Sequence, residues 1–185
     1  ALTKPGARNV TTAELPEEIK FADGDLVVGD ANLSFQHRNR VWVFNRLALE
    51  QPQLDKSAKR YARSGIWKIE GVPVKFSELI TAAGPDKWRL KSRYHSPEAT
   101  NNTSLLALEL AVPATQREFS VSGRKFVIPE IFDQRISIFD GRFNELLLPV
   151  GNGLTLKIRG NESLYVQDNR KWNTNTISFR LKFDS

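Results

Sequence analysis

The sequence contains no cysteine and no methionine, and its only histidines are His37 and His95. Without cysteine no disulfide can form, and zinc sites built from Cys and His spacings are excluded. The acidic cluster Asp23, Asp25 and Asp30 departs from the calcium-loop pattern D-x-[DN]-x-[DN]-G, and its members suit turns equally well. We therefore expect neither a metal nor a cofactor. Because cysteine is absent, the redox compartment, and with it the localisation, stays undetermined.

Motifs of nucleotide and hydrolase chemistry are also missing. No G-x-x-x-x-G-K-[ST] loop and no G-x-S-x-G elbow occurs. Gly151-x-Gly153 lacks the third glycine of a dinucleotide fingerprint, so it predicts a hairpin turn. The longest apolar stretch, residues 105–112, is interrupted by Glu109 and is shorter than the ~20 residues that a bilayer requires. We expect no membrane span.

The composition is that of a folded globular domain. Hydrophobic residues make up 40% of the 185 residues and charged residues 26%, which is far from the polar composition of a disordered chain. With eleven Phe and no Met, the core has to be filled by stiff aromatic and branched side chains. No repeat, linker or low-complexity tract divides the chain, so we expect a single β-rich domain over residues 1–185.

Alternation of apolar and polar residues with period two predicts most of the secondary structure. The pattern is clearest in the second half, at residues 119–121, 126–128, 136–138, 154–158 and 177–183, and further strands are expected at residues 26–28, 33–35, 41–49 and 66–69. Ser122-Gly123 predicts a tight hairpin turn. The pattern predicts a mainly β fold, an antiparallel β-sandwich of jelly-roll type, with a partly open β-barrel as the alternative.

One or two short helices are expected beside these strands. Between Pro52 and Gly65, apolar residues recur at helical spacing while the basic residues fall elsewhere. A shorter helix over residues 77–83 would have Ser77 as its cap and Gly84 as its terminator. Residues 96–103 are the most loop-like stretch of the chain.

Charge is distributed unevenly, and the excess lies in the middle of the chain. The net charge is +6, but residues 38–93 carry thirteen basic and five acidic side chains, an excess of eight. Two segments combine cations with aromatic residues, as a surface for a polyanion or a glycan would. The candidate binding residues are Lys87, Trp88, Arg89, Lys91, Arg93, Tyr94, His95, Arg170, Lys171 and Trp172. The alternative is a plain strand whose Trp88 points inward while its cations face water.

Three classes of function follow from these observations. The leading hypothesis is a non-enzymatic domain that binds an anionic or polyhydroxylated polymer, a nucleic acid or a glycan, through a basic surface containing tryptophan. The second is a self-assembling structural subunit of a virion, tail or cell surface, which rests on the strand-rich fold alone. The third is a glycan hydrolase that uses two carboxylates near strand ends, from the set Glu130, Asp133, Asp140 and Glu145. Solvated turn positions explain those four acids equally well.

Overall fold

The computed structural model describes residues 2–3, 19–22, 25–38, 42–44, 49–57, 60–69, 72–84, 87–95 and 105–183. Within these residues the backbone forms strands and one 3-10 helix, without an α-helix. The elements are β1 (Leu2–Thr3), β2 (Ile19–Ala22), β3 (Asp25–Val28), β4 (Ala31–Arg38), β5 (Trp42–Phe44), β6 (Leu49–Ser57), β7 (Arg60–Ile69), β8 (Val72–Gly84), β9 (Lys87–His95), β10 (Leu105–Pro113), β11 (Glu118–Val121), β12 (Arg124–Val127), β13 (Ser137–Arg142), β14 (Glu145–Pro149), β15 (Thr155–Arg159), β16 (Ser163–Asp168), η2 (Asn169–Trp172) and β17 (Thr176–Phe183).

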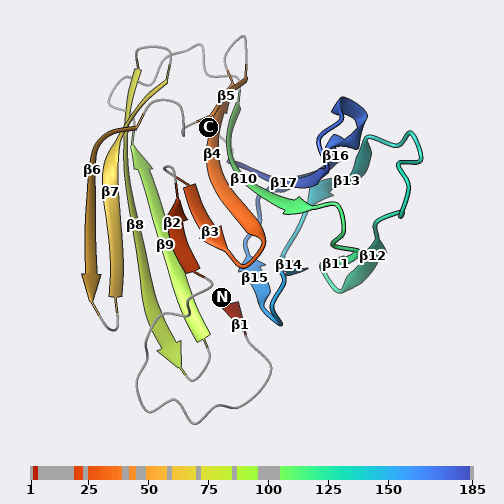
Figure 1. Cartoon of the computed structure of the whole chain (residues 1–185), viewed down its shortest axis with the longest axis horizontal. Helices are drawn as coiled ribbons and strands as arrows, with labels where there is room; N and C mark the ends of the chain where they lie inside the picture. Colours follow the sequence, from red (N-terminus) through yellow and green to blue (C-terminus); the bar gives the residue numbers. More distant parts are fainter. Residues whose placement is uncertain are drawn as a thin grey trace.

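The strands form two antiparallel sheets (Figure 1). Sheet A has nine strands in the order β12-β11-β14-β15-β1-β9-β8-β7-β6. Sheet B has eight, in the order β13-β16-β17-β10-β4-β3-β2, with β5 paired to β4 beside this path. The short strand β1 joins the two halves of sheet A, because it pairs with β15 on one side and β9 on the other. The prediction of a mainly β, antiparallel sandwich is confirmed, and the sheets do not close into a barrel.

One hydrophobic core includes residues from both sheets. Phe119 of β11 stacks on Phe126 of β12 at a ring-centroid distance of 5.1 Å and meets the edge of Phe179 of β17, in the other sheet, at 4.9 Å. The pairs Phe119–Phe126 and Phe126–Phe139 confirm that stiff aromatic rings fill this part of the core. Burial alternates along β14 and β16, as expected for strands with one apolar face.

Two predicted turns form where glycine and its neighbours permit a positive φ. Ser122 and Gly123 have φ of 51° and 82°, the left-handed pair that a two-residue hairpin between β11 and β12 requires. The 151–153 turn between β14 and β15 also has a positive φ at each residue. It contacts the β3–β4 turn, where the Asp30 N–H donates to the Val150 carbonyl oxygen at 2.6 Å. A Cβ at Gly151 would collide with the Asp30 carboxylate.

The predicted helix between Pro52 and Gly65 is wrong. These residues belong to β6 and β7, which pair antiparallel around an irregularity in register between Glu50 and Gln53. Pro52 lies at that irregularity, where a strand tolerates a residue without an N–H. β7 also pairs with β8 along its whole length. Hydrogen bonding to two neighbouring strands outweighs a local helical periodicity, because sheet formation depends on tertiary context more than on propensity.

The shorter predicted helix, over residues 77–83, is also wrong, since these residues continue β8. Burial in this strand alternates with period two: Phe76, Glu78 and Ile80 are buried, and Ser77 is exposed. The predicted loop over residues 96–103 lies outside the described residues. In the part of the chain that the structure describes, no helix has the length and apolar character to cross a bilayer.

Candidate binding surfaces

The basic segment 87–95 forms β9, and its side chains alternate between two faces. Trp88 is buried and Leu90 is half-buried on the face turned toward the core. The basic residues on the other face are exposed. These exposed residues are here called the β9 row and comprise Lys87, Arg89, Lys91, Arg93 and His95.

Trp88 belongs to the hydrophobic core and has only 8% of its surface exposed. Its strand neighbours are Ala82 of β8 and Leu2 of β1. Within the described residues its indole Nε1 finds no hydrogen-bond partner. The ring of Trp88 is therefore not available to a ligand. The structure shows the alternative arrangement, a strand whose Trp88 points inward while its cations face water. Tyr94 also lies in β9, opposite Phe76.

The neighbouring strand β8 adds one cation and no acid to the face that carries the β9 row. Lys75, Ser77, Leu79 and Thr81 alternate with the buried residues of β8, and Lys75 is paired in register with His95. The carboxylate of this strand, Glu78, lies on the core side. No ion pair is found for Lys75 or for the β9 row in the described part of the chain.

Glu78 pairs instead with a cation that is itself buried. The distance from Arg63 Nη2 to Glu78 Oε2 is 2.7 Å, and each side chain is only 6% exposed. Arg63 Nε donates a second bond to the same oxygen at 2.9 Å. The two residues are directly opposite in the β7–β8 register. Arg63 is one of the basic residues that the predicted helix between Pro52 and Gly65 kept off its apolar face, and the sheet instead buries it.

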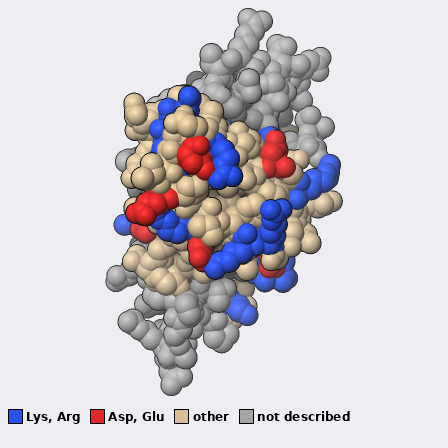
Figure 2. Space-filling model, turned by 90° about the vertical axis from the view of Figure 1, so that its right-hand side faces the viewer, with Lys and Arg blue, Asp and Glu red and all other residues tan. Residues whose placement is uncertain are grey.

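Three described cations elsewhere in sheet A have acidic partners, whereas Arg124 of β12 lies over the ring of Phe126, 4.9 Å from its centroid. Lys125 pairs with Glu118 at 2.7 Å. Lys157 and Arg159 pair with Glu145 at 2.9 Å and 3.1 Å. Figure 2, which faces the right-hand side of Figure 1, shows acidic and basic groups interspersed on that side. The β9 row differs from these regions in having exposed cations without neighbouring carboxylates among the described residues.

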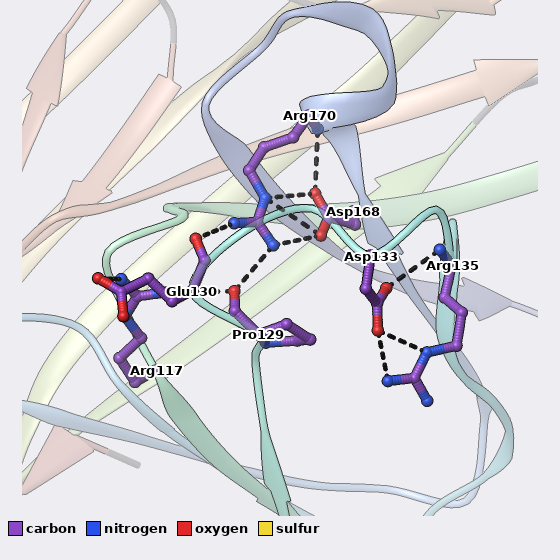
Figure 3. A network of polar contacts seen from close by, with 7 residues as sticks. All are labelled: Arg117, Pro129, Glu130, Asp133, Arg135, Asp168 and Arg170. Atoms are coloured by element: carbon purple, nitrogen blue, oxygen red, sulfur yellow. Dashed lines mark hydrogen bonds and ion pairs between the residues drawn. The ribbon is translucent and has the colours of Figure 1, made fainter.

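The second predicted basic segment, 170–172, lies in η2 and its first cation has a structural role. Arg170 bonds both oxygens of Asp168, with Nη2 at 2.6 Å from Oδ2 and Nε at 2.9 Å from Oδ1. It also donates to the carbonyl oxygens of Pro129 and Glu130 at 3.0 Å and 2.8 Å (Figure 3). Hydrogen bonding to Asp168 raises the pKa of Arg170. Arg170 fixes the 129–130 loop to η2, while Lys171 and Trp172 are exposed.

The two predicted segments do not form one surface. β9, at the left of Figure 1, belongs to sheet A, whereas η2 follows β16 of sheet B, at the upper right. Trp172, at 56% exposure, is therefore a separate feature from the β9 row.

Trp172 borders a groove that the sequence did not reveal. The groove has a volume of ≈ 500 Å³ and lies over β4, β10 and β17, on the residues that alternate with the core positions of sheet B. Its lining is mostly polar or small and includes Asp30, Asn32, Ser34, Trp172, Asn175 and Thr176. We call it the sheet-B groove. The only sequence signal was a run of small polar residues at the outward positions of β4 and β17, which is also what a solvated face looks like.

The four candidate catalytic carboxylates are held by separate basic partners. Asp133 Oδ2 accepts a hydrogen bond from Arg135 Nε at 2.7 Å, and hydrogen bonding to Arg135 lowers the pKa of Asp133. Glu130 lies on the same loop, but its carboxylate is directed away from Asp133 and toward Arg117, 3.7 Å away (Figure 3).

Of the remaining two acids, Asp140 is 3.9 Å from Lys182, and the bonds from Lys157 and Arg159 lower the pKa of Glu145. A general acid requires a raised pKa. Asp133 and Glu145 are therefore suited to remain ionised, and this arrangement does not support the hydrolase hypothesis.

Metal-ligating residues do not gather in the described part of the chain, where no group of three or more His, Asp or Glu side chains could hold an ion. Asp23 of the acidic cluster lies outside the described residues. His95 is an exposed member of the β9 row, and His37 lies in β4.

Comparison with known proteins adds no identity. No family model matches the chain, and neither the curated proteins nor the solved structures provide a match. The function is therefore argued from the β-sandwich and from the positions of its side chains.

Proposed function

We propose that this protein binds an anionic polymer, a chain of regularly spaced phosphate or sulfate groups, through the β9 row and Lys75. The observation that carries the proposal is that these exposed side chains have no ion-pair partner among the described residues. Cations without acidic neighbours produce a field of one sign, which attracts polyanions and accelerates their association. The excess of basic residues in the middle of the sequence is thereby partly gathered on one sheet face.

The spacing of the row suits an extended polymer. Alternate residues of a strand lie about 6.6–6.8 Å apart on the same face, so the four Lys and Arg residues of β9 cover about 20 Å. Lys75 extends the surface sideways, because directly opposite residues of antiparallel strands have Cβ atoms about 4.5–5.5 Å apart. A flexible chain lying along β9 can therefore place several anions beside cations at once.

Binding should depend strongly on salt and weakly on sequence. Four contacts to a single-stranded nucleic acid give a slope of about −3 in log affinity against log salt, or about a fiftyfold loss for a fourfold increase in salt. Trp88 is in the core, and the imidazole of His95, at the end of the row, is the one aromatic ring among the described outward positions of β8 and β9. Bases therefore have a single ring to stack on, at one end of the row, and little discrimination among base sequences is expected.

The test is a titration of fluorescent single-stranded DNA and of heparin at several salt concentrations. The variant Arg89→Gln/Lys91→Gln should bind about tenfold or more weakly at low salt, with a slope reduced by about 1.4 for the DNA. The matched control is Arg124→Gln/Lys171→Gln, which removes two exposed cations from other elements and should bind as the original protein does. The DNA and heparin arms distinguish phosphate from sulfate as the preferred anion.

Two results would overturn the proposal. One is failure of the original protein to bind either polymer at low salt. The other is an equal loss of affinity in the β9 variant and in the control, which would mean that only the net charge matters.

A further inference from the structure

The sheet-B groove has a rigid polar floor. Asn169 Nδ2 donates to Ser178 Oγ at 2.6 Å and to Thr176 Oγ1 at 3.0 Å, and Asn169 Oδ1 accepts from Gln167 at 2.7 Å. These bonds connect the end of β16 to two outward positions of β17. Because a satisfied network holds its members in single rotamers, the floor is preorganised for a ligand.

Among the described lining residues of the groove, one ion pair and one further carboxylate carry charge. Arg180 Nε donates to Glu109 Oε2 at 2.9 Å, and both side chains are about nine-tenths buried. Asp30 is exposed at the rim, without an ion-pair partner in the described part of the chain. The described lining of the groove therefore contains no cation besides the paired Arg180, and a polyanion of the kind proposed for the β9 row is disfavoured there.

Trp172 is held at the rim by a short, well-bonded turn. Asn173 follows it in the left-handed region, with φ 58°, and its N–H donates to the Arg170 carbonyl oxygen at 3.1 Å. The Asn175 carbonyl oxygen accepts from the Ala114 N–H at 3.0 Å, which attaches the same turn to the end of β10. An indole that is 56% exposed on an anchored turn provides a flat apolar face beside polar groups.

We propose that the sheet-B groove binds a neutral saccharide, independently of the polyanion surface on β9. The indole of Trp172 packs against the face of a sugar ring that carries C–H groups, because that face is apolar. The Asp30 carboxylate accepts hydroxyl protons, and the Asn175 amide both donates and accepts, which are the bonds that a polyhydroxylated ligand requires. The volume of ≈ 500 Å³ lies within the range of about 300–1,000 Å³ typical of small-molecule sites.

The experiment is affinity electrophoresis in gels containing a neutral polysaccharide, with a glucan, a xylan, a mannan and a galactan as the panel. At least one polysaccharide should retard the protein. Trp172→Ala should weaken that binding about tenfold or more, because loss of a stacking ring is costly, while Trp172→Phe should retain most of it. Asp30→Asn should weaken binding without lowering the melting temperature, since the side chain is exposed.

Two controls separate this proposal from the polyanion proposal. Val127→Ala removes another exposed apolar side chain, 64% exposed on β12, and should leave retardation unchanged. Arg89→Gln/Lys91→Gln should also leave it unchanged, so each proposal can fail while the other stands. The inference is overturned if no polysaccharide of the panel retards the protein, if Trp172→Ala is retarded as strongly as the original, or if a lysine-rich peptide displaces the saccharide by binding more tightly in the groove.

Discussion

The stability of Trp88 variants tests the central assignment of β9, because it measures which face of the strand meets the core. Trp88 is 8% exposed and belongs to the core cluster. Truncating a large buried aromatic residue costs about 3–5 kcal/mol, the sum of lost transfer free energy and a cavity. We therefore expect Trp88→Ala to lower the free energy of unfolding by about 3–5 kcal/mol, whereas Trp172→Ala should change it by less than about 0.5 kcal/mol.

The indole N–H makes the prediction sharper. Because Trp88 Nε1 has no partner in the described part of the chain, the native protein pays a desolvation cost for this donor of about 1–3 kcal/mol. Trp88→Phe removes that donor together with some apolar area, so the two effects oppose each other. The net cost should be small, below about 1.5 kcal/mol, in contrast to the alanine variant.

The assay is urea unfolding followed by circular dichroism, with the polymer affinity of the folded fraction measured in parallel. A lower midpoint at an unchanged slope would report a change in stability alone. Both Trp88 variants should bind the polymer with the affinity of the original protein. If Trp88→Ala unfolded at nearly the original midpoint but lost polymer affinity, the indole would face the ligand, and the burial of Trp88 in the core would be refuted.

Three further predictions concern other parts of the fold. Arg63→Met should lower the unfolding free energy by about 3–5 kcal/mol, because it leaves the Glu78 carboxylate buried without its cation, and adding Glu78→Met should recover much of the loss in the same urea assay. Gly151→Ala should lower the melting temperature, since φ is 80° there and a Cβ would collide with a neighbouring carboxylate. The pKa of Glu145 is lowered in the folded state, so its contribution to stability is present above the unfolded pKa and is lost as the pH falls through the folded pKa. Glu145→Gln should therefore show a shallower decline of melting temperature below about pH 4.5 than the original protein does, and an equal decline would contradict this assignment.

The strands of the second half could be read from the sequence because each has one apolar face. Residues 119–121, 154–158 and 177–183 alternate with period two, and the structure places the apolar members of 119–121, 154–158 and 177–181 in or against the common core. The turns at residues 122–123 and 151–153 were also predicted correctly, since the positive φ that they require favours glycine and asparagine. These strands and turns depend on residues that are neighbours in the sequence, so local patterns were sufficient to predict them.

The segment between Pro52 and Gly65 shows where local patterns fail. The spacing of its apolar residues fits a helix, but β7 pairs with β6 on one side and with β8 on the other. The register with β8 also brings Arg63 opposite Glu78 and buries both. A cation in the interior is tolerated only when such a partner is present, and the partner lies on a strand that the sequence had also assigned to a helix.

The sequence by itself determined the alternation of most strands, the impossibility of a disulfide and the excess of cations in residues 38–93. It left open which face of β9 would be exposed, because period two defines two faces without saying which one meets the core. The tertiary structure decided that Trp88 faces inward, that the β9 row faces out and that Trp172 lies elsewhere on sheet B. It also assembled the sheet-B groove from β4, β10, η2 and β17. The physical reason is that the antiparallel neighbours of sheet B come from distant parts of the chain, and only their pairing brings the polar side chains together.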